Sequence, residues 1–215
     1  VLKEHHENAM TKLQITVDIV LFTILERQLH VLLIRRLAEP FRGSYALPGG
    51  FVLENESVDE AAHRELQEET GVEKVFLEQL YTFGEPNRDP RGRVITVAYY
   101  ALVANSHILR SSTDAADAAW FSLDKLPPVA FDHQSIIEYA QQRLRNKLDY
   151  SNVGFELLPE KFTLTELQLV HEAILGANLD KRNFRRKILQ QGIVEPSKEW
   201  QKTGRKPAQL YRFVD

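Results

Sequence analysis

The sequence predicts two folded units, an α/β domain with a mixed sheet and then a small domain of helices and a hairpin. Up to about residue 150, runs of β-branched and aliphatic residues alternate with two helix patterns. Beyond residue 159 the pattern changes to two closely spaced helices and short strands. The irregular stretch Asp149–Pro159 separates these patterns, so the predicted domains are residues 1–150 and residues 151–215.

The first domain is expected to place its helices on both faces of the sheet. One helix begins near Val58, after a capping box formed by Ser57 and Glu60, and stops at Gly71. A second helix covers Asp132–Lys147, with Asp132 as its N-cap. Extended segments around these helices predict an α/β/α sandwich. They are Leu13–Leu25, His30–Arg36, Ser44–Leu53, Val75–Phe83, Val94–Val103 and Ala118–Ser122.

The second domain reads as a helix-turn-helix followed by a hairpin. Thr163 and Glu166 form another capping box, which opens a helix with an apolar side made of Leu164, Leu167, Val170, Ile174 and Leu175. After a turn at residues 176–179, Asp180 caps a second helix that ends at Gly192. Its apolar stripe is expected to be Phe184, Ile188 and Leu189. Short strands at Ile193–Val194 and Gln209–Phe213 should flank the basic loop Lys202–Pro207.

Charge is distributed unevenly along the chain. The formal net charge is −3, yet Asn178–Arg212 holds ten Lys/Arg against three Asp/Glu. An acidic body with a basic end predicts an anionic partner at that end. The chain has no cysteine, no visible signal peptide and no apolar run long enough to span a bilayer, which predicts a cytoplasmic protein without membrane contact.

Seven carboxylates gather between residues 54 and 69, where Arg64 is the only fixed positive charge. Glu65, Glu68 and Glu69 have the i, i+3, i+4 spacing that places them on one helix face. Such hard oxygen ligands suit Mg²⁺ or Mn²⁺, and a carbonyl of the preceding turn at Gly50 could complete the site. The alternative is a solvated acidic helix face.

Segment 50–72 resembles the Nudix box, position for position. The matching residues are Gly50, Glu56, Arg64, Glu65, Leu66, Glu68, Glu69, Gly71 and Val72. The resemblance implies that the three helix glutamates bind cations beside a diphosphate. A diphosphate also attracts guanidinium groups, and the candidate ligand residues are Arg35, Arg36, Arg88, Arg91 and Arg93, with Tyr45 as a stacking ring. A plain surface role is the alternative for each arginine, and helix capping and packing are expected for Asp132 and His133.

The second helix of the small domain is expected to contact duplex DNA. The candidate residues are Lys181, Arg182, Asn183, Arg185, Arg186 and Lys187 on the helix, with Lys202, Arg205 and Lys206 in the hairpin loop. The domain resembles a winged helix, in which the recognition helix enters the major groove and the wing reaches backbone or minor groove. An ordinary basic surface helix is the alternative reading.

Together the two units resemble the Nudix-related transcriptional regulators of bacterial NAD metabolism (NrtR type), from about Lys12 onward. The resemblance implies a homodimeric repressor that ADP-ribose releases from operator DNA. The complete Nudix box keeps an Mg²⁺-dependent ADP-ribose pyrophosphatase as the alternative, with Asp114 and Asp117 as weak candidates for a general base and the catalytic residues otherwise unknown. A third hypothesis, an RNA-processing Nudix enzyme, is disfavoured because a helix does not fit the major groove of A-form RNA.

Overall fold

The computed structural model describes residues 12–73, 75–104, 118–148, 157–203 and 206–214. Its first domain contains a seven-stranded sheet with a central path in the order β3-β2-β1-β6-β5, while β4 pairs with β1 and β7 with β2. The strands are β1 (Gln14–Leu25), β2 (Gln28–Arg35), β3 (Tyr45–Ala46), β4 (Gly49–Phe51), β5 (Glu78–Phe83), β6 (Val94–Leu102) and β7 (Ala118–Ser122). The β1–β6 pair is parallel and the other pairs are antiparallel, which confirms a mixed sheet.

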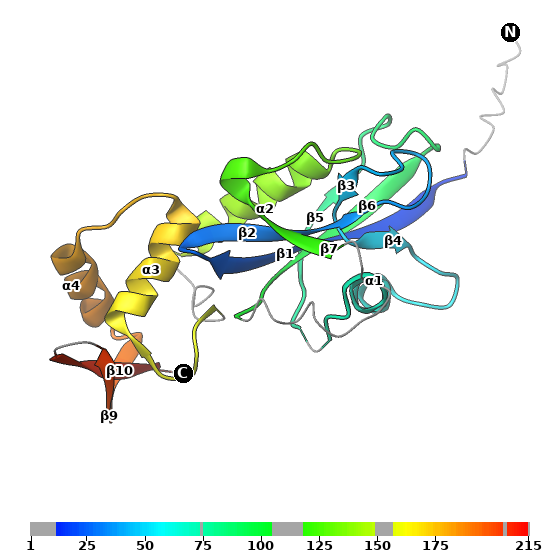
Figure 1. Cartoon of the computed structure of the whole chain (residues 1–215). Coiled ribbons are helices and arrows are strands. Elements are labelled where there is room, and N and C mark those ends of the chain that lie inside the picture. The colour runs from blue at the N-terminus through cyan, green and yellow to red at the C-terminus, as the bar shows by residue number, and fades with distance from the viewer. Residues whose placement is uncertain (1–11, 74, 105–117, 149–156, 204–205, 215) are drawn as a thin grey trace, which may run out of the picture.

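Two helices cover opposite faces of this sheet, α1 (Val58–Thr70) and α2 (His133–Lys147) (Figure 1). Strand β1 shows why, since its residues from Thr16 to Thr23 are all buried. Successive side chains of a strand point to opposite faces. Val17, Ile19 and Leu21 therefore pack on the α1 side, while Val20 and Phe22 pack on the α2 side. The predicted α/β/α sandwich is confirmed.

Helix α1 begins and ends at the predicted residues. Ser57 accepts a hydrogen bond from the backbone N–H of Glu60, whose side chain in turn accepts from the N–H of Ser57. Gly71 adopts the left-handed conformation at the C-cap, with φ of 70°. At α2, Asp132 is the N-cap residue as predicted, but its carboxylate makes no capping hydrogen bond and binds Arg88 instead.

The second domain is a winged helix. Helices α3 (Leu164–Leu175) and α4 (Lys181–Gln191) pack on a sheet of β8 (Phe162–Thr163), β10 (Lys206–Phe213) and β9 (Val194–Thr203), in that strand order. The Thr163–Glu166 capping box and the Asp180 cap form as predicted. The hairpin strands are longer than predicted, so Lys202 and Lys206 belong to strands and not to a loop.

Two leucines assigned to the core of this domain are instead partly exposed. Leu189 is 47% exposed and Leu175 is 37% exposed. Phe184 and Ile188, one turn apart, are the buried residues of α4. Leu189 follows Ile188 by one residue, about 100° around the helix, and this rotates its side chain away from the core.

The two domains share one hydrophobic cluster. Leu157, Val170 and Ile174 pack in the cluster formed by α2 and one face of the large sheet. Arg145 of α2 also donates from Nε to the carbonyl of Ile174, at 3.2 Å. Figure 1 shows α3 against the end of the β1–β2 hairpin. The domain boundary near residue 150 stays a prediction, since residues 149–156 lie outside the described part. No helix in the described part is long and apolar enough to cross a membrane.

Candidate functional site

Arg64 organises the acidic segment at the start of α1. Its guanidinium binds both oxygens of Glu56, at 2.6 and 2.9 Å, and donates to Glu65 at 2.8 Å and Glu68 at 3.2 Å. It also donates to the carbonyl of Phe51 at 3.2 Å. The hydrogen bonds from Arg64 lower the pKa of Glu56 to about 2. One arginine thus fixes the loop before α1 against the acidic helix face.

The turn that leads into β4 at Gly49 and Gly50 lies close to the backbone of β1 and to the Glu65 side chain of α1. A Cβ on Gly50 would lie 2.2 Å from Oε1 of Glu65, and a Cβ on Gly49 would lie 2.1 Å from the carbonyl oxygen of Val17. Gly49 also has φ of 154°. Its N–H donates to Oε2 of Glu69 at 2.8 Å. The turn therefore lies beside two of the three predicted metal-binding carboxylates.

Glu69 lies in an environment that opposes its negative charge. Burial raises the pKa of Glu69 to about 8, the charges of Glu65 and Asp18 add to the rise, and the Gly49 hydrogen bond and Arg36 only partly oppose it. A buried carboxylate beside other carboxylates is stabilised by a cation. This observation fits a divalent ion at Glu65, Glu69 and the Gly50 turn.

The predicted metal residues differ in their surroundings. The Glu65 side chain is mostly buried, whereas that of Glu68 is 60% exposed. Both carboxylates bind Arg64. Within the described residues, no three Asp, Glu or His side chains already converge as a ligand cluster. The set Glu65, Glu68, Glu69 and Gly50 stays a prediction, with Glu65 and Glu69 best placed.

A small cavity of about 60 Å³ lies next to these carboxylates. Three arginines line it, Arg36, Arg88 and Arg91, and two of these, Arg36 and Arg91, lie against aromatic rings. The Arg36 guanidinium lies 4.7 Å from the ring centre of Phe131, and that of Arg91 lies 4.7 Å from Phe51 and 5.3 Å from Phe131. Burial, and next the charge of Arg91, lower the pKa of Arg36. Two neighbouring guanidinium groups suit an anion with several oxygens. Arg91 is also bound to both oxygens of Asp89, at 3.0 and 2.6 Å, so Arg36 is the less neutralised of the two.

Arg88, also predicted as a ligand residue, has its side chain bound to carboxylates. It is bidentate to Asp132, at 2.7 and 2.9 Å, and also contacts Asp18 at 3.3 Å. Its side chain is 3% exposed. These contacts join β1, the loop before β6 and the start of α2. We therefore assign Arg88 a structural role beneath the cavity.

His133 completes this network as a neutral ring. Nδ1 accepts a hydrogen bond from the N–H of Leu47 at 2.9 Å, and Nε2 lies 3.3 Å from Asp18. Burial lowers the pKa of His133, and because Nδ1 is an acceptor the proton is assigned to Nε2. The packed role expected from the sequence agrees with this geometry, and His133 holds the strand that leads into the Gly49–Gly50 turn.

Three other predicted ligand residues lie outside the cavity lining. Arg35 donates to the carbonyl of Gly43, and Arg93 donates to that of Gly84. Tyr45 packs edge-on against Phe121, with ring centres 4.6 Å apart. Asp114 and Asp117 lie outside the described residues. Phe131, which lines the cavity, was not among the predicted ligand residues.

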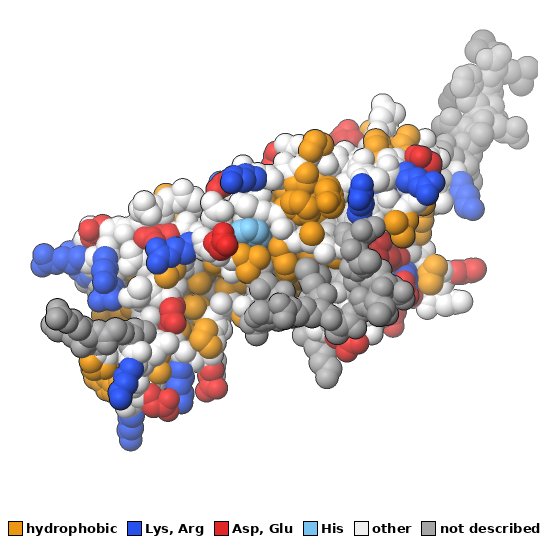
Figure 2. All heavy atoms as spheres, viewed as in Figure 1, with side chains coloured by type: hydrophobic (Ala, Val, Ile, Leu, Met, Phe, Trp, Pro, Cys, Tyr) orange, Lys and Arg blue, Asp and Glu red, His pale blue; other side chains and the backbone are white. Residues whose placement is uncertain are grey.

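Helix α4 presents most of its basic residues to solvent, at an end of the molecule where Lys and Arg side chains gather (Figure 2). The exposed residues are Lys181, Arg182, Asn183, Arg186 and Lys187. Arg185 is half-buried and donates to Oγ1 of Thr165 at 3.1 Å. Lys202 is exposed on β9. The Lys206 side chain and the whole of Arg205 lie outside the described part.

This fold and this site define a Nudix domain joined to a winged-helix DNA-binding domain. The family models agree, since the NUDIX domain matches residues 12–140 and the NrtR DNA-binding winged helix domain matches residues 154–213. The chain belongs to the NrtR family of Nudix proteins.

Similar proteins carry one or both domains. The ADPR responsive transcriptional repressor NtrR of Acinetobacter baylyi is 40% identical over 93% of this chain and 81% of its own length. An ADP-ribose pyrophosphatase of Methanocaldococcus jannaschii is 44% identical over 54% of this chain and 68% of its own. Shewanella oneidensis NrtR complexed with a 27mer DNA has a TM-score of 0.81 and 40% identity over 93% of each chain. The Nudix domain of that protein, complexed with ADP ribose, has a TM-score of 0.56 and 39% identity over 66% of this chain and 94% of its own.

Proposed function

We propose that the chain is a transcriptional repressor in which the Nudix domain senses ADP-ribose or a related nucleoside diphosphate and the winged helix binds operator DNA. The observation that carries the proposal is the presence in one chain of the Arg36–Arg91 cavity and of the basic, exposed α4. The Acinetobacter relative, named as an ADPR responsive repressor, extends over both domains. The regulated genes are proposed to belong to NAD metabolism.

The cavity offers the groups that a diphosphate needs. Arg36 and Arg91 would donate charge-assisted hydrogen bonds to its oxygens, and Phe131 holds both guanidinium groups in place. Glu65, Glu68, Glu69 and the carbonyl of Gly50 would hold Mg²⁺ or Mn²⁺ beside them. When bound, the cation supplies positive charge that neutralises both the carboxylates and the diphosphate.

Two copies of the chain are proposed to bind one operator. A single recognition helix reads only a few base pairs, and paired half-sites match a two-fold dimer. The dimer would have one arrangement that binds DNA and another that binds ADP-ribose. ADP-ribose would then shift the population towards its own arrangement and away from the one that binds DNA. A coupling of about 1–3 kcal/mol would change operator affinity about fivefold to 150-fold.

The test is a reciprocal titration at fixed salt. ADP-ribose is expected to weaken binding of an operator duplex, and the duplex is expected to weaken ADP-ribose binding by the same factor, because linkage is symmetric. Formation of AMP is followed in the same samples. An unchanged DNA affinity in saturating ADP-ribose would exclude the sensor function.

A metal-dependent ADP-ribose pyrophosphatase is the second candidate. The complete box with its Gly49–Gly50 turn favours it, as does the 44% identical pyrophosphatase from Methanocaldococcus. Rapid AMP formation without any effect of ADP-ribose on DNA binding would establish this function in place of the first.

A further inference from the structure

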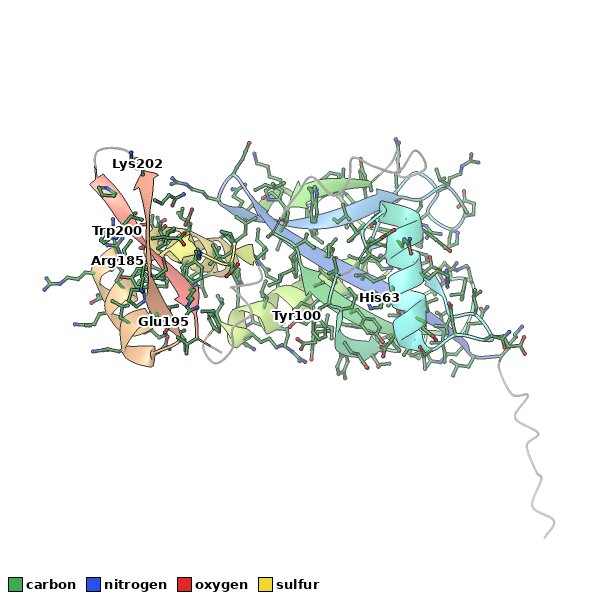
Figure 3. All side chains as sticks on the ribbon, turned by 90° about the horizontal axis from the view of Figure 1, so that it is seen from below. His63, Tyr100, Arg185, Glu195, Trp200 and Lys202 are labelled. Atoms are coloured by element: carbon green, nitrogen blue, oxygen red, sulfur yellow. The ribbon has the colours of Figure 1, made fainter. Side chains whose placement is uncertain are left out.

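A second cavity, of about 310 Å³, lies between the two domains. The Nudix domain lines it with the β1–β2 turn, α2 and the short 3-10 helix η2 (Leu123–Lys125), and the winged helix lines it with α3 and the turn that leads to α4. Figure 1 shows the end of β1 and β2 beside α3, and Figure 3 shows the same neighbours from below. None of its lining residues belongs to the Arg36–Arg91 cavity. The polar residues of this interdomain cavity include Arg27, Gln28, Asp124, Arg145, Glu172 and Asn178.

Two arginines of the Nudix domain line the interdomain cavity. Arg27, in the β1–β2 turn, is exposed. Arg145 of α2 donates from Nε to the carbonyl of Ile174, and one of its terminal nitrogens would lie 3.7 Å from a Cβ on Gly176. Within the described residues, neither arginine forms a salt bridge with a carboxylate. Their remaining N–H groups can therefore bind the oxygen atoms of a ligand.

The carboxylates of the interdomain cavity, in contrast, have neutral hydrogen-bond donors. Glu172 accepts from the N–H of Leu179 at 2.8 Å and from the amide of Gln168 at 2.9 Å. These hydrogen bonds lower the pKa of Glu172, and the charge of Arg27 adds to the effect. Asp124 accepts from a side-chain amide of β2 at 3.4 Å. The cavity therefore offers more free donors than free acceptors, and its carboxylates stay ionised.

Glu172 also connects the interdomain cavity to the DNA-binding helix. Gln168 is 9% exposed and donates both to Glu172 and to the carbonyl of Leu179, at 2.9 Å each. Leu179 is thus held through both of its backbone groups. The next residue, Asp180, caps the first turn of α4. A molecule that contacts Glu172 and Asn178 would therefore act on the turn that fixes the start of α4.

We propose that the interdomain cavity binds a small sugar phosphate, with its phosphate on the two arginines and its hydroxyl groups on the two carboxylates, and that this second effector restrains α4. A phosphate monoester has the anionic oxygens that guanidinium groups bind. Sugar hydroxyl groups can donate to carboxylates. The volume is within the range of small-molecule sites, about 300–1,000 Å³. The binding site is independent of the proposed function, whereas its effect through α4 rests on that function.

Calorimetry with ribose 5-phosphate tests the site directly. The wild-type protein is expected to bind it more tightly than inorganic phosphate, which lacks the hydroxyl groups, and more tightly than ribose, which lacks the phosphate. Arg27→Gly should weaken its binding about tenfold to a hundredfold, the effect of one lost charged hydrogen bond. Arg27 has φ of 65°, a conformation that glycine adopts readily, so this variant should keep the β1–β2 turn and the melting temperature of the wild type. The matched control is Lys125→Ala, which removes a positive charge next to Asp124 but outside the cavity lining and should leave binding unchanged.

Operator binding gives the second measurement. The DNA is a duplex that the wild-type protein selects from a randomised library. Ribose 5-phosphate is expected to change the affinity for this duplex by about fivefold or more, a typical allosteric coupling. Arg27→Gly should show no such change at the same concentration, because the effector no longer binds.

Four results would decide against a part of this reasoning. If the wild type binds ribose 5-phosphate no better than inorganic phosphate or ribose, a sugar phosphate is not the ligand. If Arg36→Met removes the binding and Arg27→Gly does not, the ligand occupies the Arg36–Arg91 cavity and the inference is overturned. If binding depends on Arg27 but leaves DNA affinity unchanged, the effector role is wrong. If the wild type selects no duplex, the proposed function fails, while calorimetry still decides whether the interdomain cavity is a ligand site.

Discussion

Replacing Arg88 with methionine is expected to destabilise the fold, whereas the same change at Arg36 should mainly weaken ligand binding. Arg88 is the buried partner of Asp18 and Asp132, whose side chains are 9% and 22% exposed. Without it, two carboxylates lose their cation inside the protein. Removing one partner of a buried ion pair costs about 3–5 kcal/mol. For a chain of this length, each kcal/mol lowers the melting temperature by about 2–4 °C.

Thermal unfolding should therefore show Arg88→Met melting about 6–20 °C below the wild type. Arg36 donates to the backbone carbonyls of Pro40 and Ala38 and forms no salt bridge within the described residues, so Arg36→Met breaks no buried ion pair. Its melting temperature should change little, while calorimetry should show ADP-ribose affinity falling about tenfold to a hundredfold, the effect of one lost charged hydrogen bond.

A double variant is the control for the role of Arg88. Combining Arg88→Met with Asp132→Asn removes one of the two stranded charges and should recover part of the lost stability, since contacting residues are not additive. If Arg88→Met melts with the wild type and loses only ADP-ribose affinity, the assignment of Arg88 as a structural residue is wrong.

Three further predictions concern the other sites. Arg182→Ala with Arg186→Ala, a pair spaced i, i+4 on exposed positions of α4, should lower the salt slope of DNA binding by about two; equal gel-shift affinity at all salt concentrations would contradict this. Glu69→Gln should sharply weaken Mg²⁺ or Mn²⁺ binding in calorimetry, because a charged oxygen ligand is lost; equal affinity would show that the ion binds elsewhere. Light scattering should give twice the chain mass of 24.8 kDa for the free protein, and that mass plus one duplex when DNA is bound; one chain per particle in both states would exclude the dimer.

The elements that the sequence predicted well are those that local rules determine. The capping boxes at Ser57 and Thr163 each depend on residues three positions apart, and both form. Strand β7 also has the predicted bounds, Ala118–Ser122, and all five of its residues are half-buried. The hairpin strands were predicted too short because basic residues are common in loops, although here they continue the ladder as far as Thr203.

The ligand residues were harder to predict because their roles depend on distant parts of the chain. Five arginines were equal candidates by residue type. Arg88 is separated from Asp132 by 44 positions and from Asp18 by 70. That these two carboxylates neutralise the Arg88 guanidinium can therefore be recognised only from the folded structure. Arg36 and Arg91 differ from the others through Phe131, which lies more than 35 positions beyond both of them and brings them to one cavity.

The hydrophobic cluster shared by the domains limits how this architecture can be rearranged. Val170 and Ile174 of the DNA-binding domain complete a cluster that also contains Ile136, Ala140 and Leu144 of α2. A chimera that carries another winged helix would need matching residues at these positions, or it would expose apolar surface where the domains meet. A domain exchange therefore cannot be designed by joining two domains within the linker alone. Exchange of the DNA-reading domain requires the outer face of α3 to change together with α2.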